Sequence, residues 1–163
     1  KRILLDRLPD LLSGYGKSLK EFPAIVVVVV DLDQRNCIQF KQELLDVLHA
    51  CNPSPRTLFR IAIEEMEAWL LGDKEAVKKA FPDAKVQVLD TYIQDSICGT
   101  WEKLADAIYK GGALALIKMG YPYIGQIKHE WASKIAPHLD PEKNKSRSFQ
   151  VFREGLCKIA GCE

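Results

Sequence analysis

A run of six β-branched residues, Ile25–Val30, limits the folds that are open to this chain, and Asp31-Leu32-Asp33 follows it directly. β-branched residues favour strands, and an unbroken apolar run cannot leave one sheet face in water without a large exposed patch. We therefore expect a central, parallel strand that is covered on both faces. Its carboxyl end would place Asp31 and Asp33 where α/β sheets bind their ligands.

The two aspartates are candidate metal ligands. They lie two residues apart, so strand geometry would direct both side chains to the same side. Neighbouring carboxylates repel each other unless a cation lies between them, and Mg²⁺ (or Mn²⁺) with waters and phosphate oxygens is the expected ion. The structural alternative is that Asp33, which precedes Gln34-Arg35-Asn36, only caps the next helix or opens a turn.

Composition sets outer limits on the class of protein. The 163 residues, 47% hydrophobic and 28% charged, fit one globular domain over residues 1–163. A net charge of +1 argues against a uniformly basic nucleic-acid surface but leaves room for a local basic stripe. Five cysteines without a C-x-x-C pair fit neither a disulfide framework nor a zinc cluster, which favours a cytoplasmic protein. No apolar stretch reaches the roughly 18 residues of a membrane span.

Hydrophobic periodicity and turn residues predict the secondary structure. The expected helices cover residues 2–13, 37–50, 64–71, 74–81, 100–109, 113–118, 124–138 and 148–159, with Asp73 and either Ser146 or Ser148 as caps. The expected strands cover residues 25–30, 58–63 and, at an edge, 85–89. This order predicts an α/β fold, a mostly parallel sheet flanked by helices, with a helical C-terminal portion over residues 100–163.

The second strand brings further carboxylates to the same predicted edge. Glu64, Glu65 and Glu67 follow it, and Glu64 and Glu67 share a helical face. We expect Glu64 to be a third metal ligand and Glu67 a catalytic carboxylate. The structural alternatives are first-turn acids that complement the helix dipole and, for Glu67, a solvated face.

One concentration of basic residues could bind the phosphates of a substrate. It comprises Lys143, Lys145, Arg147 and Arg153, with Lys128 and Lys134 on the preceding helix. A solvated loop is the alternative interpretation.

Four parts of the sequence together resemble a known family. They are Val26–Asp33, then Cys37 and Lys41, then Arg60–Asp73 with its Glu-Ala-Trp-Leu-Leu-Gly-Asp run, and last Asn144–Phe149 with Phe152. Over nearly its whole length the chain resembles a family of bacterial proteins of unknown function related to the Toprim domain. Toprim is the catalytic domain of topoisomerases, bacterial primases and the overcoming-lysogenization-defect nucleases.

This resemblance implies an activity and one further catalytic residue that has no match in this sequence. It implies that Asp31 and Asp33 bind Mg²⁺ in the hydrolysis of nucleic acid phosphodiesters, DNA being the expected substrate, in phage defence or DNA maintenance. A Toprim domain also uses a Glu at the end of its first strand, which no residue here matches. Because the chain begins without Met inside a predicted helix, we expect that strand to lie upstream.

Two other functions stay open at this point. The first is a non-catalytic interaction module that partners an ATPase, in which Glu67-Ala68-Trp69 only packs. The second is a nucleotide phosphatase or phosphotransferase, where Asp-x-Asp also follows a buried strand, but its further motifs are not found at convincing positions.

Overall fold

The computed structural model describes the backbone of residues 2–161 and the side chains from Leu5 to Gly161. The chain divides into two compact units, residues 1–61 and 62–163. The architecture is mixed α/β, with a two-stranded parallel sheet, flanking helices and a helical C-terminal part, as the sequence predicts. The prediction of one domain over the whole length stays a prediction. None of the described helices has the length and apolar character that crossing a bilayer requires.

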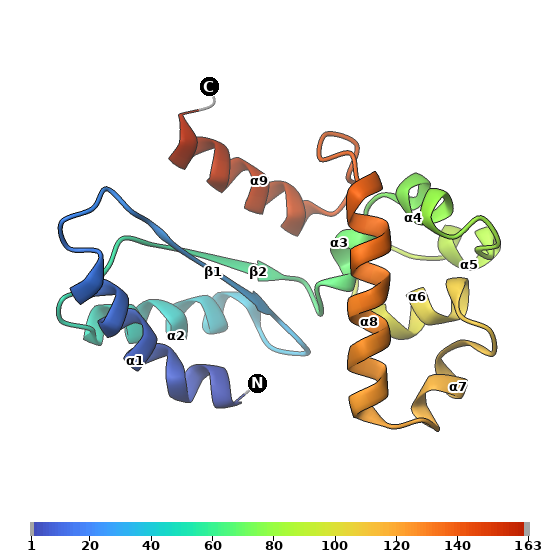
Figure 1. Ribbon diagram of the computed structural model, residues 1–163, viewed down its shortest axis with the longest axis horizontal. Coiled ribbons are helices and arrows are strands. Elements are labelled where there is room, and N and C mark those ends of the chain that lie inside the picture. The colour runs from blue at the N-terminus through green and yellow to red at the C-terminus, as the bar shows by residue number, and fades with distance from the viewer. Residues whose placement is uncertain (1, 162–163) are drawn as a thin grey trace. The chain divides into compact units, whose positions relative to one another are not determined.

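The first unit is a strand-helix-strand unit with one additional helix. It comprises α1 (Arg2–Ser18), β1 (Val26–Asp31), α2 (Cys37–Ala50) and β2 (Thr57–Ala62), whose last residue begins the second unit. β1 and β2 are neighbours in the sheet, and α1 and α2 contact each other alongside it (Figure 1). The predictions for β1, α2 and β2 are therefore confirmed to within about one residue at each end.

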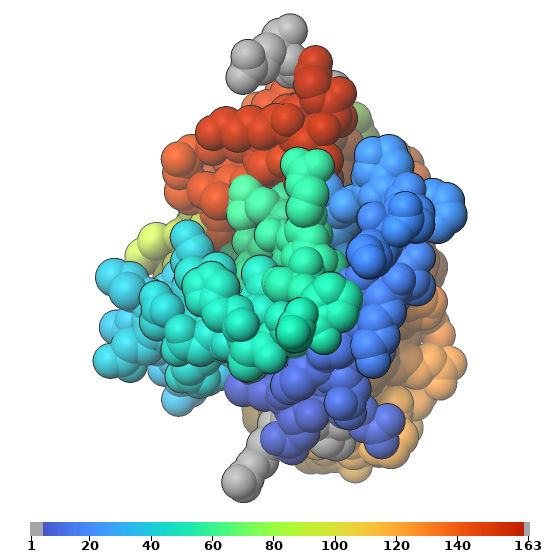
Figure 2. All heavy atoms as spheres, turned by 90° about the vertical axis from the view of Figure 1, so that its left-hand side faces the viewer, coloured from blue at the N-terminus to red at the C-terminus, as the bar shows by residue number. Residues whose placement is uncertain are grey.

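Helix α1 is longer than predicted, because Ser13-Gly14 does not end it. Leu8, Leu12 and Gly16 are spaced four residues apart and are all buried, so packing carries the helix past Gly14. Gly16 has no side chain, and a Cβ there would overlap the carbonyl oxygen of Pro53. The end of α1 and the loop before β2 line a common hollow, and Figure 2 shows the first part of the chain (blue) beside the green segment that contains β2.

The prediction of a β1 covered on both faces is wrong for the described structure. Val30 is 5% exposed, but Val27 is 39% exposed. Helices cover the faces of a sheet, and the two helices of the first unit, which contact each other, leave Val27 partly exposed.

After Ala62, the regular elements described in the second unit are all helices (Figure 1). Its helices are α3 (Glu67–Leu71), α4 (Lys74–Ala80), α5 (Val86–Asp90), α6 (Thr100–Ile108), α7 (Gly112–Ile117), α8 (Tyr121–Ile135), the 3₁₀ turn η1 (Ala136–His138) and α9 (Arg147–Ala160). The predicted caps are confirmed: the Asp73 side chain accepts from the N–H of Ala76, and the Ser146 side chain from the N–H of Phe149.

Three predicted boundaries or types in this unit are wrong. Residues 85–89 are not an edge strand but part of α5, since the described second unit offers no strand to pair with and Leu89 instead packs into the helical core. Helix α3 begins at Glu67 because Glu64 has φ 58°, a left-handed conformation that a helix cannot contain. Helix α8 begins at Tyr121, with Pro122 in its first turn, where a loop was expected.

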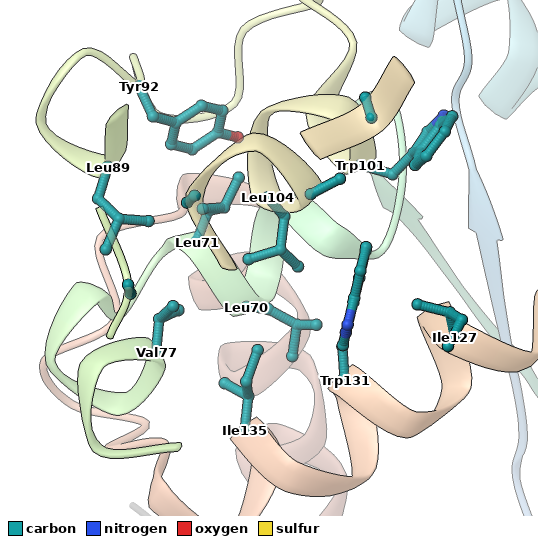
Figure 3. Packing of buried hydrophobic residues seen from close by; sticks show 14 of the residues in the cluster. Leu70, Leu71, Val77, Leu89, Tyr92, Trp101, Leu104, Ile127, Trp131 and Ile135 are labelled. Atoms are coloured by element: carbon teal, nitrogen blue, oxygen red, sulfur yellow. The ribbon is translucent and has the colours of Figure 1, made fainter. Parts of the chain in front are cut away.

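A single hydrophobic cluster holds the second unit together (Figure 3). Leu71, Leu104, Leu116 and Ile135 are fully buried there, and they come from α3, α6, α7 and α8. Each such side chain contributes about 1.5–3 kcal/mol relative to an exposed one. This core fixes α3 against α6 and α8, which carry Glu67, Glu102 and Lys128.

Candidate functional site

The aspartate pair lies at the carboxyl end of β1, as predicted. Asp31 is the last residue of the strand, and Asp33 stands in the following turn with φ 57°. The side chain of Asn36, not that of Asp33, caps α2 by accepting from the N–H groups of Ile38 (3.0 Å) and Gln39 (3.1 Å). The cap of α2 is therefore Asn36, whereas the other half of the structural alternative is confirmed, because Asp33 lies in the turn that the N–H of Arg35 closes on the carbonyl of Leu32 (3.3 Å).

The geometry of the pair differs from the expected one. Because β1 ends at Asp31, the alternation rule that predicted convergence of the two side chains does not extend to Asp33. Both carboxylates interact with other groups of the protein. Among the described residues, no group of three or more His, Cys, Asp or Glu side chains is arranged to hold a metal ion. The metal site stays a prediction.

Glu64 caps a helix that is distant in the sequence. Its carboxylate accepts hydrogen bonds from the N–H groups of Cys98 (3.1 Å), Gly99 (2.9 Å) and Thr100 (2.8 Å), and from the Thr100 hydroxyl. Gly99 is the N-cap residue of α6 and has no side chain to offer, so Glu64 satisfies the free N–H groups at the start of that helix.

These bonds determine the charge state of Glu64. Burial disfavours the ionised form, but the Thr100 hydroxyl and the N–H groups of Gly99, Cys98 and Thr100 favour it more strongly and hold the pKa of Glu64 below its usual range. As a metal ligand, Glu64 would have to give up some of these donors. That role stays a prediction, and the cap explains the residue without it.

Lys128 on α8 joins two other carboxylates. Its Nζ lies 3.0 Å from Oε2 of Glu65 and 3.1 Å from Oε1 of Glu67, and 5.8 Å from the centre of the Trp101 ring. Glu67 is 7% exposed, so its solvated-face alternative is wrong. A buried carboxylate of this kind requires a cation, and Lys128 supplies it.

Both members of the Glu67–Lys128 pair have a raised pKa. Burial raises the pKa of Glu67, and the neighbouring Lys128 only partly opposes this. Burial lowers the pKa of Lys128, but Glu67 and Glu65 together outweigh it, and the pKa is raised. The ion pair thus outweighs burial for Lys128 but not for Glu67. The reason is that Lys128 has two carboxylate partners, whereas Glu67 shares its one ammonium partner with Glu65.

Glu102 on α6 adds a carboxylate close to this pair. Burial raises the pKa of Glu102, and the charges of Glu65 and Glu64 raise it further. Its Oε2 atom is buried and has no hydrogen-bond partner among the described residues. With Glu65 and Glu67 it forms a group in which carboxylates outnumber the one ammonium, an arrangement that can retain a proton above the usual carboxyl range.

The motif residues that carry the family resemblance contact each other. The indole N–H of Trp69 donates to the Ser148 hydroxyl (2.9 Å), and the N–H of Ser148 donates to Oδ2 of Asp95 (2.7 Å). The Ser146 hydroxyl donates to Oδ1 of Asp95 (2.7 Å). The Trp69 ring stacks on the Phe152 ring, with 4.9 Å between the ring centres, and meets the Phe149 ring edge-on, with 5.6 Å between the centres. We call Trp69, Asp95, Ser146, Ser148, Phe149 and Phe152 the clasp.

Backbone contacts strengthen the clasp. The Asn144 amide donates to the carbonyl of Trp69 (2.7 Å), and the N–H of Lys145 donates to the carbonyl of Gly72 (2.8 Å). A Cβ at Gly72 would overlap the Asn144 side chain. The two motifs therefore have a structural role, which joins α3 to the segment before α9. Sequence reasoning missed Asp95, because it lies 51 residues from Ser146 along the chain.

The predicted substrate-binding cations lie on the surface. Lys143, Lys145 and Arg147 are exposed and alternate with Asn144, Ser146 and Ser148, which are buried. Three of the predicted cations form ion pairs, Lys143 with Asp140 (3.0 Å), Arg147 with Glu154 (3.1 Å) and Arg153 with Glu142 (2.8 Å). Exposed pairs are weak and a phosphate can replace the acid, so the predicted role stays open. Lys128 is occupied by Glu65 and Glu67 instead.

Comparison with known proteins gives a family and no activity. Residues 11–157 match the family model described as Domain of unknown function (DUF4276), so the chain belongs to this family. No curated protein and no solved structure matches the chain.

Proposed function

We propose that this member of the DUF4276 family is a Toprim-like nuclease that hydrolyses nucleic acid phosphodiesters with Mg²⁺ or Mn²⁺ held by Asp31 and Asp33. The observation that carries the proposal is the position of the pair. Asp31 ends the first strand of a parallel strand-helix-strand unit, and Asp33 lies in the turn beyond it.

The ion would supply two effects at these carboxylates. It neutralises charge that develops on the phosphate, and it lowers the pKa of a bound water that attacks the phosphorus. Glu67 is the proposed acid-base residue, because its burial gives it a raised pKa and general catalysis favours a carboxyl group titrating nearer neutral pH.

The proposed substrate is DNA, bound through its phosphates by Lys143, Lys145, Arg147 and Arg153. The first three cations are exposed on one short segment that its buried polar neighbours anchor, which supports this role. Such contacts are predicted to weaken steeply with salt, because each neutralised phosphate releases counterions.

Replacement of either aspartate tests the function directly. We expect Asp31→Asn or Asp33→Asn to reduce Mg²⁺-dependent cleavage of DNA by about 100-fold or more, because the ion loses a charged ligand. The matched control is Asp46→Asn on the exposed face of α2, which should retain activity. Gel-based assays measure the cleavage of DNA, and melting curves show whether each variant is folded. Full activity in either aspartate variant would remove the proposal.

The alternative proposal is a non-catalytic module that partners an ATPase. It is favoured by the absence of a pre-formed three-ligand group among the described residues and by the structural roles of Glu64 and the clasp. Titration with Mg²⁺ or Mn²⁺ separates the two. A metal-binding site adds RT ln(1 + [L]/Kd), about 2.7 kcal/mol at 100 times Kd, and raises the melting temperature, whereas the module should show no shift.

A further inference from the structure

The free edge of β1 differs from an ordinary exposed edge. Within the described residues β1 has one neighbour, β2, so its second edge has no strand beside it. No charged residue occurs from Phe22 to Val30, and Val27 is 39% exposed. Sheet edges that remain in water usually carry a charge, a proline or a bulge that prevents further pairing. β2 carries such a charge in its interior, Arg60, whereas the charged residue of β1 is Asp31 at its last position.

An apolar groove runs beside this strand. It lies between α1 and β1, inside the first unit, and has a volume of about 430 Å³. Its lining is Leu8, Leu11, Leu12, Tyr15, Leu19 and Ile25–Val29. The groove contains no charged side chain, so it suits an apolar, β-branched segment and not a polar ligand.

Backbone direction shows which groups the edge offers. The N–H of Val26 donates to the carbonyl of Arg56, the residue before β2 (2.9 Å). Successive residues of a strand direct their N–H and C=O groups to opposite edges, so Val28 also faces β2, whereas Val27 and Val29 face the free edge. Those two residues present two donors and two acceptors for a further strand.

We propose that β1 pairs with β1 of a second copy of this chain, edge to edge and antiparallel, to give a sheet of order β2-β1-β1-β2. Val27 would pair with Val29 of the partner subunit, and Val29 with Val27 of the partner subunit, around a two-fold axis at Val28. The edge is self-complementary, because valine faces valine and Asp31 lies outside the paired segment. A two-fold pair closes and leaves the Arg60-bearing strands outermost, so assembly stops at two copies.

The mass of the protein in solution tests the proposal. We expect light scattering after gel filtration to give twice the 18.4 kDa of one chain. Val27→Lys should give one chain, because each lysine would stand opposite Val29 of the partner subunit, and the two like charges would lie diagonally across the axis within reach of each other. The matched control is Ile38→Lys at an exposed apolar position of α2, 81% exposed, which should stay dimeric. Wild-type protein that remains a single chain from about 1 to 200 µM, or a dimer that survives Val27→Lys, overturns the proposal.

A pair of proline variants keeps the test valid if lysine disturbs folding. Val27→Pro removes an N–H from the free edge, so the variant should be folded but monomeric. Val28→Pro removes an N–H directed to β2 and should lower the melting temperature instead. A Val27→Pro protein that melts normally and is still dimeric would contradict β1 pairing.

Discussion

At the scale of single residues, Glu64 shows how one side chain replaces a missing local cap. α6 begins after a glycine that has no side chain, and the carboxylate that caps it comes from 35 residues earlier in the chain. Its left-handed backbone, with φ 58°, directs the chain from the end of β2 into α3. The residue that the sequence indicated as a metal ligand therefore has a defined structural role.

Glu64→Gln tests this role. The amide keeps one acceptor oxygen but loses the charge and places an NH₂ group against N–H donors, so we expect a loss of about 1–3 kcal/mol in the free energy of unfolding. Glu75→Gln is the matched control, because Glu75 is an exposed acid in the first turn of α4 and should change stability by less than about 0.5 kcal/mol. Urea unfolding measures both, and equal effects would contradict a buried cap.

The pH dependence of stability follows from the lowered pKa of Glu64. A carboxyl group whose pKa is lower in the folded state stabilises the protein above its unfolded pKa, about 4.3, and loses this contribution as pH falls through the folded value. The difference in stability between wild type and Glu64→Gln should thus be full at pH 7 and shrink below about pH 4. Thermal melts across this range check the sign, and a difference that grows toward acid would refute it.

At the scale of elements, the clasp explains why the Glu-Ala-Trp-Leu-Leu-Gly-Asp run and the Asn-Lys-Ser-Arg-Ser-Phe segment occur in one chain. α3 has only five residues and could not form a stable helix alone. Its Trp69 and Gly72 are held by Ser148, Lys145 and Asn144 from the segment that leads into α9. A short helix thereby becomes a fixed part of the core.

Two glycine variants test the close approach at α3. Gly72→Ala should destabilise the protein by about 1–3 kcal/mol, because the new methyl group overlaps the Asn144 side chain. Gly125→Ala lies inside α8 with no atom within 4 Å of the new Cβ, and should stabilise the protein by about 0.4–1 kcal/mol. Denaturant unfolding should therefore give changes of opposite sign in the free energy of unfolding. A Gly72→Ala protein of unchanged stability would mean that the segment before α9 can shift to accommodate the methyl group.

At the scale of the whole molecule, the two units differ in how their cores are built. The cluster of Figure 3 is drawn entirely from residues 70–135, within the second unit. The first unit relies on two strands and two helices, and a two-stranded sheet has little stability of its own.

We therefore expect a fragment of residues 62–163 to fold independently. It contains the complete cluster and the clasp, so it should show a helical circular dichroism spectrum and a cooperative melt. The full chain is the control. A fragment that shows no cooperative transition would mean that the second unit requires residues 1–61.

Local pattern alone determined much of the fold. The valine run predicted β1, and the period of 3.6 predicted α2, α6 and most of α9. Asp73 and Pro82 predicted α4, and of the two predicted alternatives for the start of α9, Ser146 is the cap. These features depend on side chains within about four residues of one another, which a single sequence displays directly.

Tertiary structure decided the rest, because the deciding partners are distant along the chain. Residues 85–89 alternate as a strand does, but residues 86–89 form α5, because the described second unit offers no strand to pair with. Helix α1 continues past Gly14 because Gly16 fits against Pro53. Glu64 meets Thr100, Lys128 meets Glu65 and Glu67, and Asp95 meets Ser146 and Ser148 across 36 to 63 residues. Which acids are caps and ion-pair partners depends on packing between helices, and no spacing within the sequence records it.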